Sequence, residues 1–277
     1  MDSIITALAG WRRAGWPVVR VSIRAAVGST PREAGSFMLV APDALAGTIG
    51  GGRLEWECVA RARALLAGTG EGGELEIPLG PELGQCCGGR VRVRIERADE
   101  AMLDAIVREA EAAWAGRPHL LLFGAGHVGR ALARTLAPLP LRLTWIDARA
   151  DEFGLVPEGV AVRITEDWER ALAAAPAGSG ILVLTPSHRL DALIVGAALE
   201  RGDFRYVGLI GSKTKRRGFE AGFRAVGLGV ERIATLVCPI GDRGIRDKRP
   251  EIIAALVAAE IVERLLHGED AMSERQA

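Results

Sequence analysis

Residues 119–129 read HLLLFGAGHVG, an apolar run that leads directly into a glycine-rich turn. The run predicts a short strand buried on both faces, as in a parallel sheet. Gly124, Gly126 and Gly129 have the G-x-G-x-x-G spacing, which allows a tight turn and brings backbone N–H groups close to a phosphate at a helix N-terminus. Asp147 ends the next predicted strand, where its carboxylate could accept from a ribose hydroxyl. This stretch predicts a Rossmann-type fold, a fold that does not by itself establish the ligand.

The chain continues beyond this stretch as alternating strands and helices. Strands are predicted at residues 119–123, 141–146, 160–164, 181–184 and 206–210, with a last strand-like run at 233–237. Helices are predicted at residues 128–136, 168–175, 191–200 and 249–266, the last one stopped by Gly268. This alternation is typical of βαβ units, so a Rossmann-like domain with a doubly wound parallel sheet is expected over residues 117–277.

The first 116 residues carry a different pattern and predict a mixed α+β N-terminal domain. Helices are predicted at residues 4–13, 53–66 and 99–116, and strands at 18–26, 37–40, 74–79 and 91–95. Gly116 closes the helix over residues 99–116, and Pro118 prevents its continuation. The expected domains are therefore residues 1–116 and residues 117–277.

The composition limits the classes of function. The 277 residues are 49% hydrophobic and 25% charged, which is typical of a folded globular chain. The 35 basic residues balance the 35 acidic ones, so a general nucleic-acid binder is not expected. The sequence has neither a basic leader nor an apolar stretch of about 18 residues, so a cytoplasmic protein without a membrane span is expected. Its four cysteines are then expected to be free, reactive or ligating thiols rather than a disulfide framework.

Two loops of the N-terminal region combine glycine with arginine. The first, residues 28–35, contains Arg32, and the second, residues 47–53, contains Gly50, Gly51, Gly52 and Arg53. Backbone donors beside a cation, leading into a helix, favour anion binding. The alternative is a pair of hairpin turns with solvated arginines.

A third loop contains Gln85, Cys86, Cys87 and Gly88. Adjacent cysteines pair poorly with one another because the ring that they would close is strained. Thiols next to glycine N–H groups can become reactive thiolates. The alternative is one buried cysteine beside an incidental neighbour. Zinc is disfavoured because no C-x-x-C spacing occurs.

Further candidates follow the predicted strands of the C-terminal region, where ligands of open α/β sheets bind. His188 could donate to a ligand or move a proton, or it could be structural. No acidic residue is expected to complete a triad with it, so nucleophilic catalysis by Ser187 is not expected. Ser212 is predicted to cap a helix, and the four cations at residues 213–217 could meet a phosphate, an acidic partner or only solvent. His127 and residues 238–241 could line the same crevice.

Read together, these motifs resemble the XdhC/CoxI family of accessory proteins for molybdenum hydroxylases. The matching segments are GSTPRE at 28–33, GTIGGGRLE at 47–55, GQCCGG at 84–89, GAGHVG at 124–129, VGLIGS at 207–212 and CPIG at 238–241. They occur in order along nearly the whole chain, and the three N-terminal loops are the specific ones. One departure is Pro186, where similar proteins tend to carry a histidine.

The resemblance implies a protein that binds molybdenum cofactor, protects it and delivers it to an apo xanthine dehydrogenase or a related hydroxylase. It also implies a cysteine desulfurase as partner, which supplies the terminal sulfido ligand. In this interpretation Cys86 or Cys87 contacts molybdenum, and Arg32 and Arg53 hold anionic groups. The crevice with His127 and Ser212 completes the pocket or docks the partner. The expected protein is a homodimeric carrier rather than an enzyme.

Two other interpretations remain open at this point. The first is an NAD(P)-dependent oxidoreductase, in which residues 124–129 and Asp147 bind the dinucleotide and His188 is the acid or base. The second is a scaffold whose Rossmann half holds no ligand and only forms a dimer or docks a partner.

Overall fold

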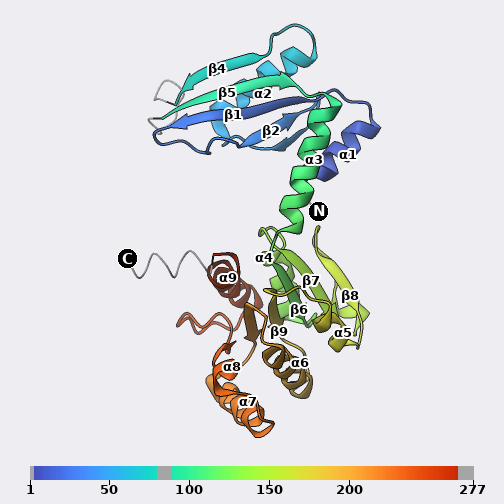
Figure 1. The fold of residues 1–277 in the computed structure, drawn as a ribbon, viewed down its shortest axis with the longest axis vertical. Helices are drawn as coiled ribbons and strands as arrows, with labels where there is room; N and C mark the ends of the chain where they lie inside the picture. Colours follow the sequence, from blue (N-terminus) through green and yellow to red (C-terminus); the bar gives the residue numbers. More distant parts are fainter. Residues whose placement is uncertain (1–2, 80–88, 268–277) are drawn as a thin grey trace. The chain divides into compact units, whose positions relative to one another are not determined.

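The computed structural model describes residues 3–79 and 89–267 and divides into two compact units, Met1–Ala115 and Gly116–Ala277 (Figure 1). The first unit contains an antiparallel sheet, and the second contains a parallel sheet of the Rossmann type. The predicted fold class is therefore confirmed. No helix within the described ranges is long and apolar enough to cross a membrane.

The first unit is a five-stranded antiparallel sheet with three helices. The strand order is β3-β2-β1-β5-β4. The strands are β1 (Val19–Val27), β2 (Phe37–Val40), β3 (Leu45–Gly47), β4 (Gly73–Pro78) and β5 (Arg90–Arg97), and the helices are α1 (Ser3–Arg13), α2 (Gly52–Leu66) and α3 (Glu100–Ala115). Strand β3 was not predicted, because its three residues are too few to show a period.

Strand β5 shows why this sheet forms. Val91, Val93 and Ile95 are buried, whereas the arginines that alternate with them are exposed. This alternation gives the strand one apolar face. Helix α2 packs on that face, and its Cys58 belongs to the same core. Burial raises the pKa of the Cys58 thiol to about 11, so Cys58 is a neutral core side chain.

The second unit is a six-stranded parallel sheet in the order β11-β10-β9-β6-β7-β8. The strands are β6 (His119–Phe123), β7 (Arg142–Asp147), β8 (Ala161–Ile164), β9 (Gly180–Val183), β10 (Tyr206–Leu209) and β11 (Leu236–Val237). The helices are α4 (His127–Leu136), α5 (Trp168–Ala173), α6 (His188–Arg201), α7 (Lys213–Ala225), α8 (Val230–Ala234) and α9 (Pro250–Ile261). The chain reverses its direction across the sheet between β6 and β9, and this point is where ligands of such sheets bind.

Strand β6 is buried on both faces, as the apolar run predicts. Leu120 and Leu122 join the core that contains α4 and α9. Leu121 and Phe123 join a second core that contains α5 and α6. Two helical layers thus cover the sheet and leave the carboxyl ends of its strands as the accessible edge.

Two predictions about the C-terminal part are corrected. The strand-like run at 233–237 is wrong for its first residues, because Ile233 and Ala234 end helix α8 and only Leu236–Val237 is a strand. Ile233 is buried from a helical turn, and a short apolar run cannot distinguish the two cases. The helix predicted to residue 266 ends at Ile261 and continues as a π-helical turn, Val262–Leu266. Its predicted stop, Gly268, lies outside the described residues.

Candidate functional site

The glycine loops of the first unit meet at one place. A Cβ on Gly50 would lie 2.7 Å from Pro31 Cγ, and Gly50 has a φ of +121°. A Cβ on Gly89 would lie 2.3 Å from the carbonyl oxygen of Ser29. The loop at 28–35 therefore contacts both the loop at 47–53 and Gly89, the last residue of the third loop. Gln85, Cys86, Cys87 and Gly88 themselves lie outside the described residues.

A carboxylate organises the loop at 47–53. Glu55 Oε2 accepts from Thr48 Oγ1 at 2.5 Å, from the N–H of Ile49 at 3.1 Å and from the N–H of Gly51 at 3.2 Å. The N–H of Gly50 donates to Thr48 Oγ1. The predicted anion site therefore cannot use these N–H groups without rearrangement, because each already has an acceptor.

The two arginines of these loops differ in their surroundings. Arg53 Nε donates to Glu57 Oε1 at 2.9 Å along helix α2, which begins at Gly52. Arg32 is exposed, and its Nε donates a long hydrogen bond of 3.4 Å to Ser36 Oγ. Arg32 is thus the freer of the two cations to turn toward an anion.

Two further arginines lie on the strands that adjoin these loops, Arg24 on β1 and Arg92 on β5. Arg92 is paired across the sheet with Ala25, the neighbour of Arg24, and both arginines are exposed. Neither has an ion pair within residues 3–79 and 89–267, whereas Arg90 pairs with Glu76 at 3.1 Å. Neither was among the predicted site residues. The signal that could have identified Arg92 is the alternation of arginine and valine at residues 90–94.

The three glycines after β6 differ in their steric surroundings. A Cβ on Gly124 would lie 2.3 Å from the carbonyl oxygen of Leu184, and φ is +116°. A Cβ on Gly129 would lie 2.1 Å from the carbonyl oxygen of Gly124. Around Gly126 nothing lies within 4 Å of the added Cβ. Gly124 and Gly129 are therefore required by the fold, whereas Gly126 leaves an open approach beside the exposed His127 in the first turn of α4.

Asp147 lies at the carboxyl end of β7, as predicted, but its oxygens already have donors. Oδ2 accepts from the N–H of Ala125 at 2.7 Å and from Arg149 Nη2 at 2.8 Å. Oδ1 accepts from the N–H and from Nε of Arg149, each at 3.0 Å. Burial raises the pKa of Asp147, but the hydrogen bonds from Arg149 and Ala125 outweigh it and lower the pKa overall. Asp147 is a charged acceptor whose lone pairs are in use.

A pocket of about 390 Å³ lies beside Asp147. Apolar side chains of β6, β7, α5 and α6 form most of its wall, and its polar rim carries Asp147, Arg149, Thr165, Glu166 and Thr185. Its position at the ends of β6, β7 and β9 is the crevice in which Rossmann-type sheets hold ligands.

A buried ion pair lies on the other side of β9. Asp191 has no exposed surface. Its carboxylate accepts from the N–H of Thr185 at 3.0 Å, from Thr185 Oγ1 at 2.8 Å and from Lys215 Nζ at 3.3 Å. His188 Nδ1 lies 4.0 Å from Asp191 Oδ2. The expectation that His188 has no acidic neighbour is thus wrong, because Asp191 lies one helical turn further along α6. The pair links the end of β9 to α7.

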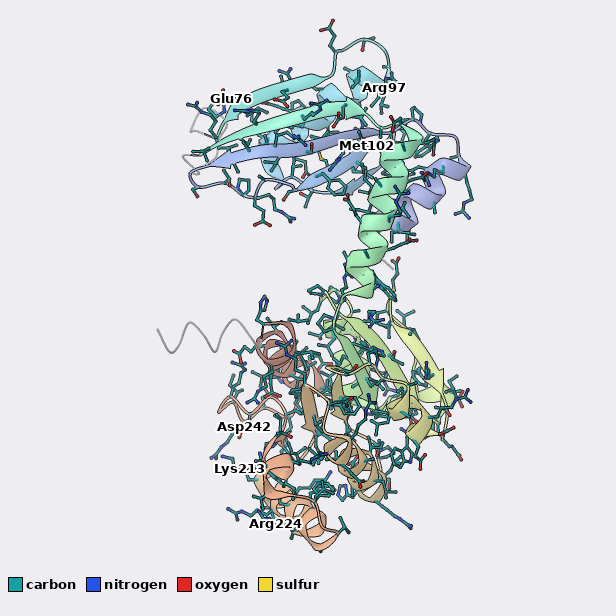
Figure 2. All side chains as sticks on the ribbon, in the orientation of Figure 1. Glu76, Arg97, Met102, Lys213, Arg224 and Asp242 are labelled. Atoms are coloured by element: carbon teal, nitrogen blue, oxygen red, sulfur yellow. The ribbon has the colours of Figure 1, made fainter. Side chains whose placement is uncertain are left out.

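Ser187 and Ser212 cap helices. Ser187 Oγ accepts from the N–H of Leu190 at 3.3 Å, and Ser212 Oγ accepts from the N–H of Lys215 at 3.1 Å. The predicted cap at Ser212 is confirmed. The neighbouring Lys213 pairs with Asp242 at 3.7 Å (Figure 2).

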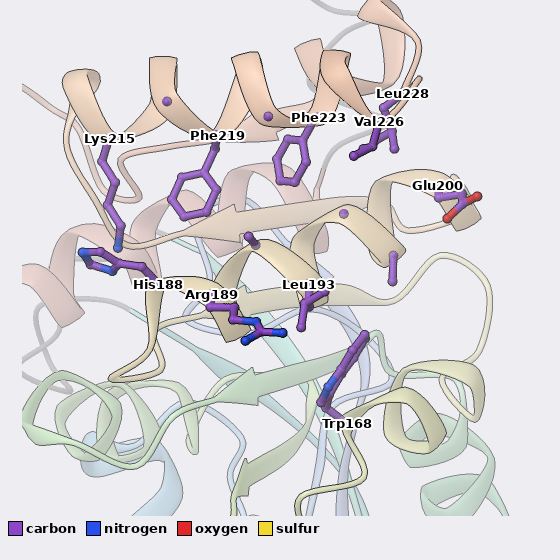
Figure 3. A pocket seen from close by; sticks show the side chains of 15 residues that line it. Trp168, His188, Arg189, Leu193, Glu200, Lys215, Phe219, Phe223, Val226 and Leu228 are labelled. Carbon is purple, nitrogen blue, oxygen red and sulfur yellow. The ribbon is translucent and has the colours of Figure 1, made fainter.

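Helices α6 and α7 enclose a groove of about 810 Å³. Figure 3 shows Phe219 and Phe223 projecting from α7 toward α6, with Lys215 and His188 at the same end of the groove. The buried Cys238 lies behind this end, since a Cβ on Gly211 would be 3.0 Å from its sulfur.

The structure thus collects the predicted residues into two groups. Arg32, Gly50, Gly51, Gly52 and Arg53 belong to the first unit, and the others that are described belong to the edge of the parallel sheet: Gly124, Gly126, Gly129, His127, Asp147, His188 and Ser212. In the described part of the chain, no group of three or more histidine, cysteine or acidic side chains is arranged to hold a metal ion.

Two family models match separate parts of this chain. The model of the XdhC Rossmann domain matches residues 120–261, and the model of the XdhC and CoxI family matches residues 11–77. Protein YqeB of Escherichia coli (strain K12) is 27% identical over 266 residues, covering 94% of this chain and 46% of YqeB. The chain therefore spans about half the length of that relative. A crystal structure of a Bacillus halodurans protein, described as a xanthine dehydrogenase, has a TM-score of 0.77 at 18% identity and covers 99% of this chain and 98% of its own. That structure has the same fold.

Proposed function

The chain belongs to the XdhC and CoxI family, and from this membership we propose that it binds molybdenum cofactor as cargo and protects it. In this proposal the protein assists sulfuration of the cofactor and delivers it to an apo xanthine dehydrogenase or a related molybdenum hydroxylase. The family is associated with maturation of these enzymes. A cysteine desulfurase as second partner and a homodimeric assembly are parts of the same proposal.

The observation that carries the proposal is the meeting of the loops in the first unit. Gly50 packs on Pro31, and Gly89 packs on Ser29. The N–H of Leu79 also donates to the carbonyl oxygen of Gly89 at 2.8 Å, which brings together the two ends of the segment that contains Cys86 and Cys87. The two residues that flank that segment, Leu79 and Gly89, therefore lie beside the loop of Arg32.

The charges around this place suit a phosphorylated pterin. Arg24, Arg32 and Arg92 are exposed, and guanidinium groups bind phosphate through paired N–H donors. A thiolate of Cys86 or Cys87 would be a soft ligand of the kind that molybdenum accepts. Cys58 and Cys238 are poor competitors, because burial raises the pKa of both thiols.

The edge of the parallel sheet has a separate part in the proposal. His127, His188 and Ser212 lie at the carboxyl ends of its strands, where they would complete the pocket or contact the client enzyme. An oxidoreductase that uses a dinucleotide with an unmodified ribose receives less support, since Asp147 has no free acceptor for a ribose hydroxyl.

The test is retention of the cargo. The purified full chain is mixed anaerobically with molybdenum cofactor and passed through a size-exclusion column, and molybdenum and pterin are measured in the protein fraction. We expect near-stoichiometric retention, which the double variant Cys86→Ala/Cys87→Ala loses and the buried-thiol variant Cys238→Ala keeps. Absence of both molybdenum and pterin from the fraction would refute the proposal.

The arginines need their own matched pair of variants. Arg24→Ala/Arg92→Ala removes one charge from β1 and one from β5, neither with an ion pair within the described residues, whereas Arg90→Ala/Arg94→Ala removes two charges from β5 that are paired with Glu76 and Glu96. We expect the first variant to release the cofactor at lower salt than the second. Equal release would mean that only net charge matters and that Arg24 and Arg92 do not contact the cargo.

A further inference from the structure

We propose that the crevice of the parallel sheet binds a nucleotide whose ribose carries a phosphate group, and that Arg149 contacts this phosphate. Asp147 is then the positioning residue that holds Arg149, rather than the acceptor of a ribose hydroxyl. This site does not depend on whether the protein carries molybdenum cofactor.

The pocket beside Asp147 has the position in the sheet and the lining residues expected of a nucleoside site. It lies where the chain reverses direction between β6 and β9, with a volume of about 390 Å³. Ile146, Trp168, Leu190 and Ile194 line it. Such apolar walls with a few polar groups on one rim suit a flat base and its ribose.

The turn after β6 leaves room for a diphosphate next to this pocket. Gly126 is the residue before helix α4, and a Cβ there would meet nothing within 4 Å. The first N–H groups of a helix have no partner within the helix and face an approaching anion. Gly124 lines the pocket, and Gly126 of the same turn leaves the N-terminus of α4 open to an approaching group.

The carboxylate that would hold a ribose diol is already occupied. Its two oxygens accept four hydrogen bonds, one from Ala125 and three from Arg149. An ionised carboxylate offers about four acceptor positions. A ribose hydroxyl would therefore have to displace Arg149, and this cost disfavours an unmodified ribose at Asp147.

Arg149 retains donors that point away from Asp147. Its Nε and Nη2 donate to Asp147, and its Nη1 donates to Glu152 at 3.2 Å. A guanidinium has five N–H donors, so these three bonds leave one donor on each Nη. The side chain is 42% exposed on the pocket rim. A phosphate can accept from both donors without breaking the pair with Asp147.

The rim also contains a carboxylate that could favour a nucleotide with an unphosphorylated ribose. Glu166 is exposed and lines the pocket, and its side chain has no partner within the described ranges. A ribose diol would find its acceptor there rather than at Asp147. Comparing the affinities of nucleotides with and without the ribose phosphate therefore shows whether Arg149 or Glu166 determines binding.

The experiment measures binding of adenosine 2′,5′-bisphosphate and of adenosine 5′-monophosphate to the full chain by isothermal titration calorimetry. We expect the bisphosphate to bind about tenfold more tightly or better, because a charge-assisted pair of hydrogen bonds is gained. Arg149→Ala should reduce this preference to about twofold. Arg163→Ala removes the same charge from the neighbouring strand β8, outside the pocket, and should keep the preference.

Two further variants keep the outcome decisive. Gly126→Ala adds a methyl group in open space, so it should fold normally and weaken both nucleotides together. Equal affinity for the two nucleotides, or binding of neither at millimolar concentration, would overturn the proposal. Tighter binding of the monophosphate that is lost in Glu166→Gln would overturn it in favour of a diol site.

Discussion

Lys215 Nζ lies 3.3 Å from Asp191, a carboxylate that has no exposed surface and comes from a different helix. The pair joins α6 to α7 at the carboxyl edge of the parallel sheet. Asp191 also receives both donors of Thr185, so it fixes the backbone at the end of β9. This cluster joins the first turns of α6 and α7, where His188 and Ser212 lie.

Loss of the Asp191 charge should therefore destabilise the second unit strongly. We expect Asp191→Asn to lower the free energy of unfolding by about 3 kcal/mol, since Lys215 is left without its buried counter-charge. Urea denaturation of the full chain measures the effect. The double variant Asp191→Asn/Lys215→Met should lose less than the sum of the single variants, and simple additivity would show that the two side chains are not coupled.

The glycines after β6 should separate into two classes. Gly124→Ala and Gly129→Ala should each cost about 3 kcal/mol or more, because the added methyl group would overlap backbone atoms. Gly126→Ala should stay within about 1 kcal/mol of the parent. Thermal unfolding of the three variants tests this order, and equal losses at all three positions would contradict it.

Glu55 should control the order of the loop at 47–53. In Glu55→Ala the N–H groups of Ile49 and Gly51 lose their acceptor, so we expect faster amide hydrogen exchange at both and a loss of about 1–3 kcal/mol. Glu57→Ala is the matched control. It removes an exposed pair with Arg53 that is worth about 0.5 kcal/mol. Unchanged exchange at Ile49 in Glu55→Ala would show that the loop is held by other contacts.

Alkaline pH should weaken the first unit through Cys58. Its pKa is raised by burial from 9.0 to about 11. The folded-state pKa lies above the unfolded one, so folding favours the protonated thiol. The stability that this preference contributes is complete below about pH 9 and is lost as the pH rises toward 11. The loss approaches about 3 kcal/mol. Unfolding by urea across this range should show a steeper decline for the parent than for Cys58→Ala, and parallel curves would refute the assignment.

The sequence pattern predicts positions better than it predicts contacts. The apolar run and the glycine spacing correctly locate β6 and the start of α4, since both depend on neighbours along the chain. The spacing also locates Asp147 at the end of β7. It cannot show that Arg149, two residues further on, uses the acceptors of that carboxylate, because this depends on the direction of one side chain.

Contacts between segments that are distant along the chain could not be predicted from the sequence, for another reason. Asp191 and Lys215 are 24 residues apart on two helices, and their meeting follows from the adjacency of β9 and β10. The contact of Gly50 with Pro31 likewise requires the path of two loops. Residues 233–237 were misassigned because a buried turn of helix and a buried strand expose equally little apolar surface.

The unequal surroundings of the three glycines have an evolutionary consequence. The first and third are held by selection for folding, because a methyl group at either position would overlap backbone atoms. The second is held only by whatever enters the crevice. If the proposed nucleotide occupies the crevice, a lineage that abandoned it would be free to accumulate larger residues at the position of Gly126 while keeping Gly124 and Gly129. The residue found at position 126 in a descendant would therefore indicate whether that descendant still binds the ligand.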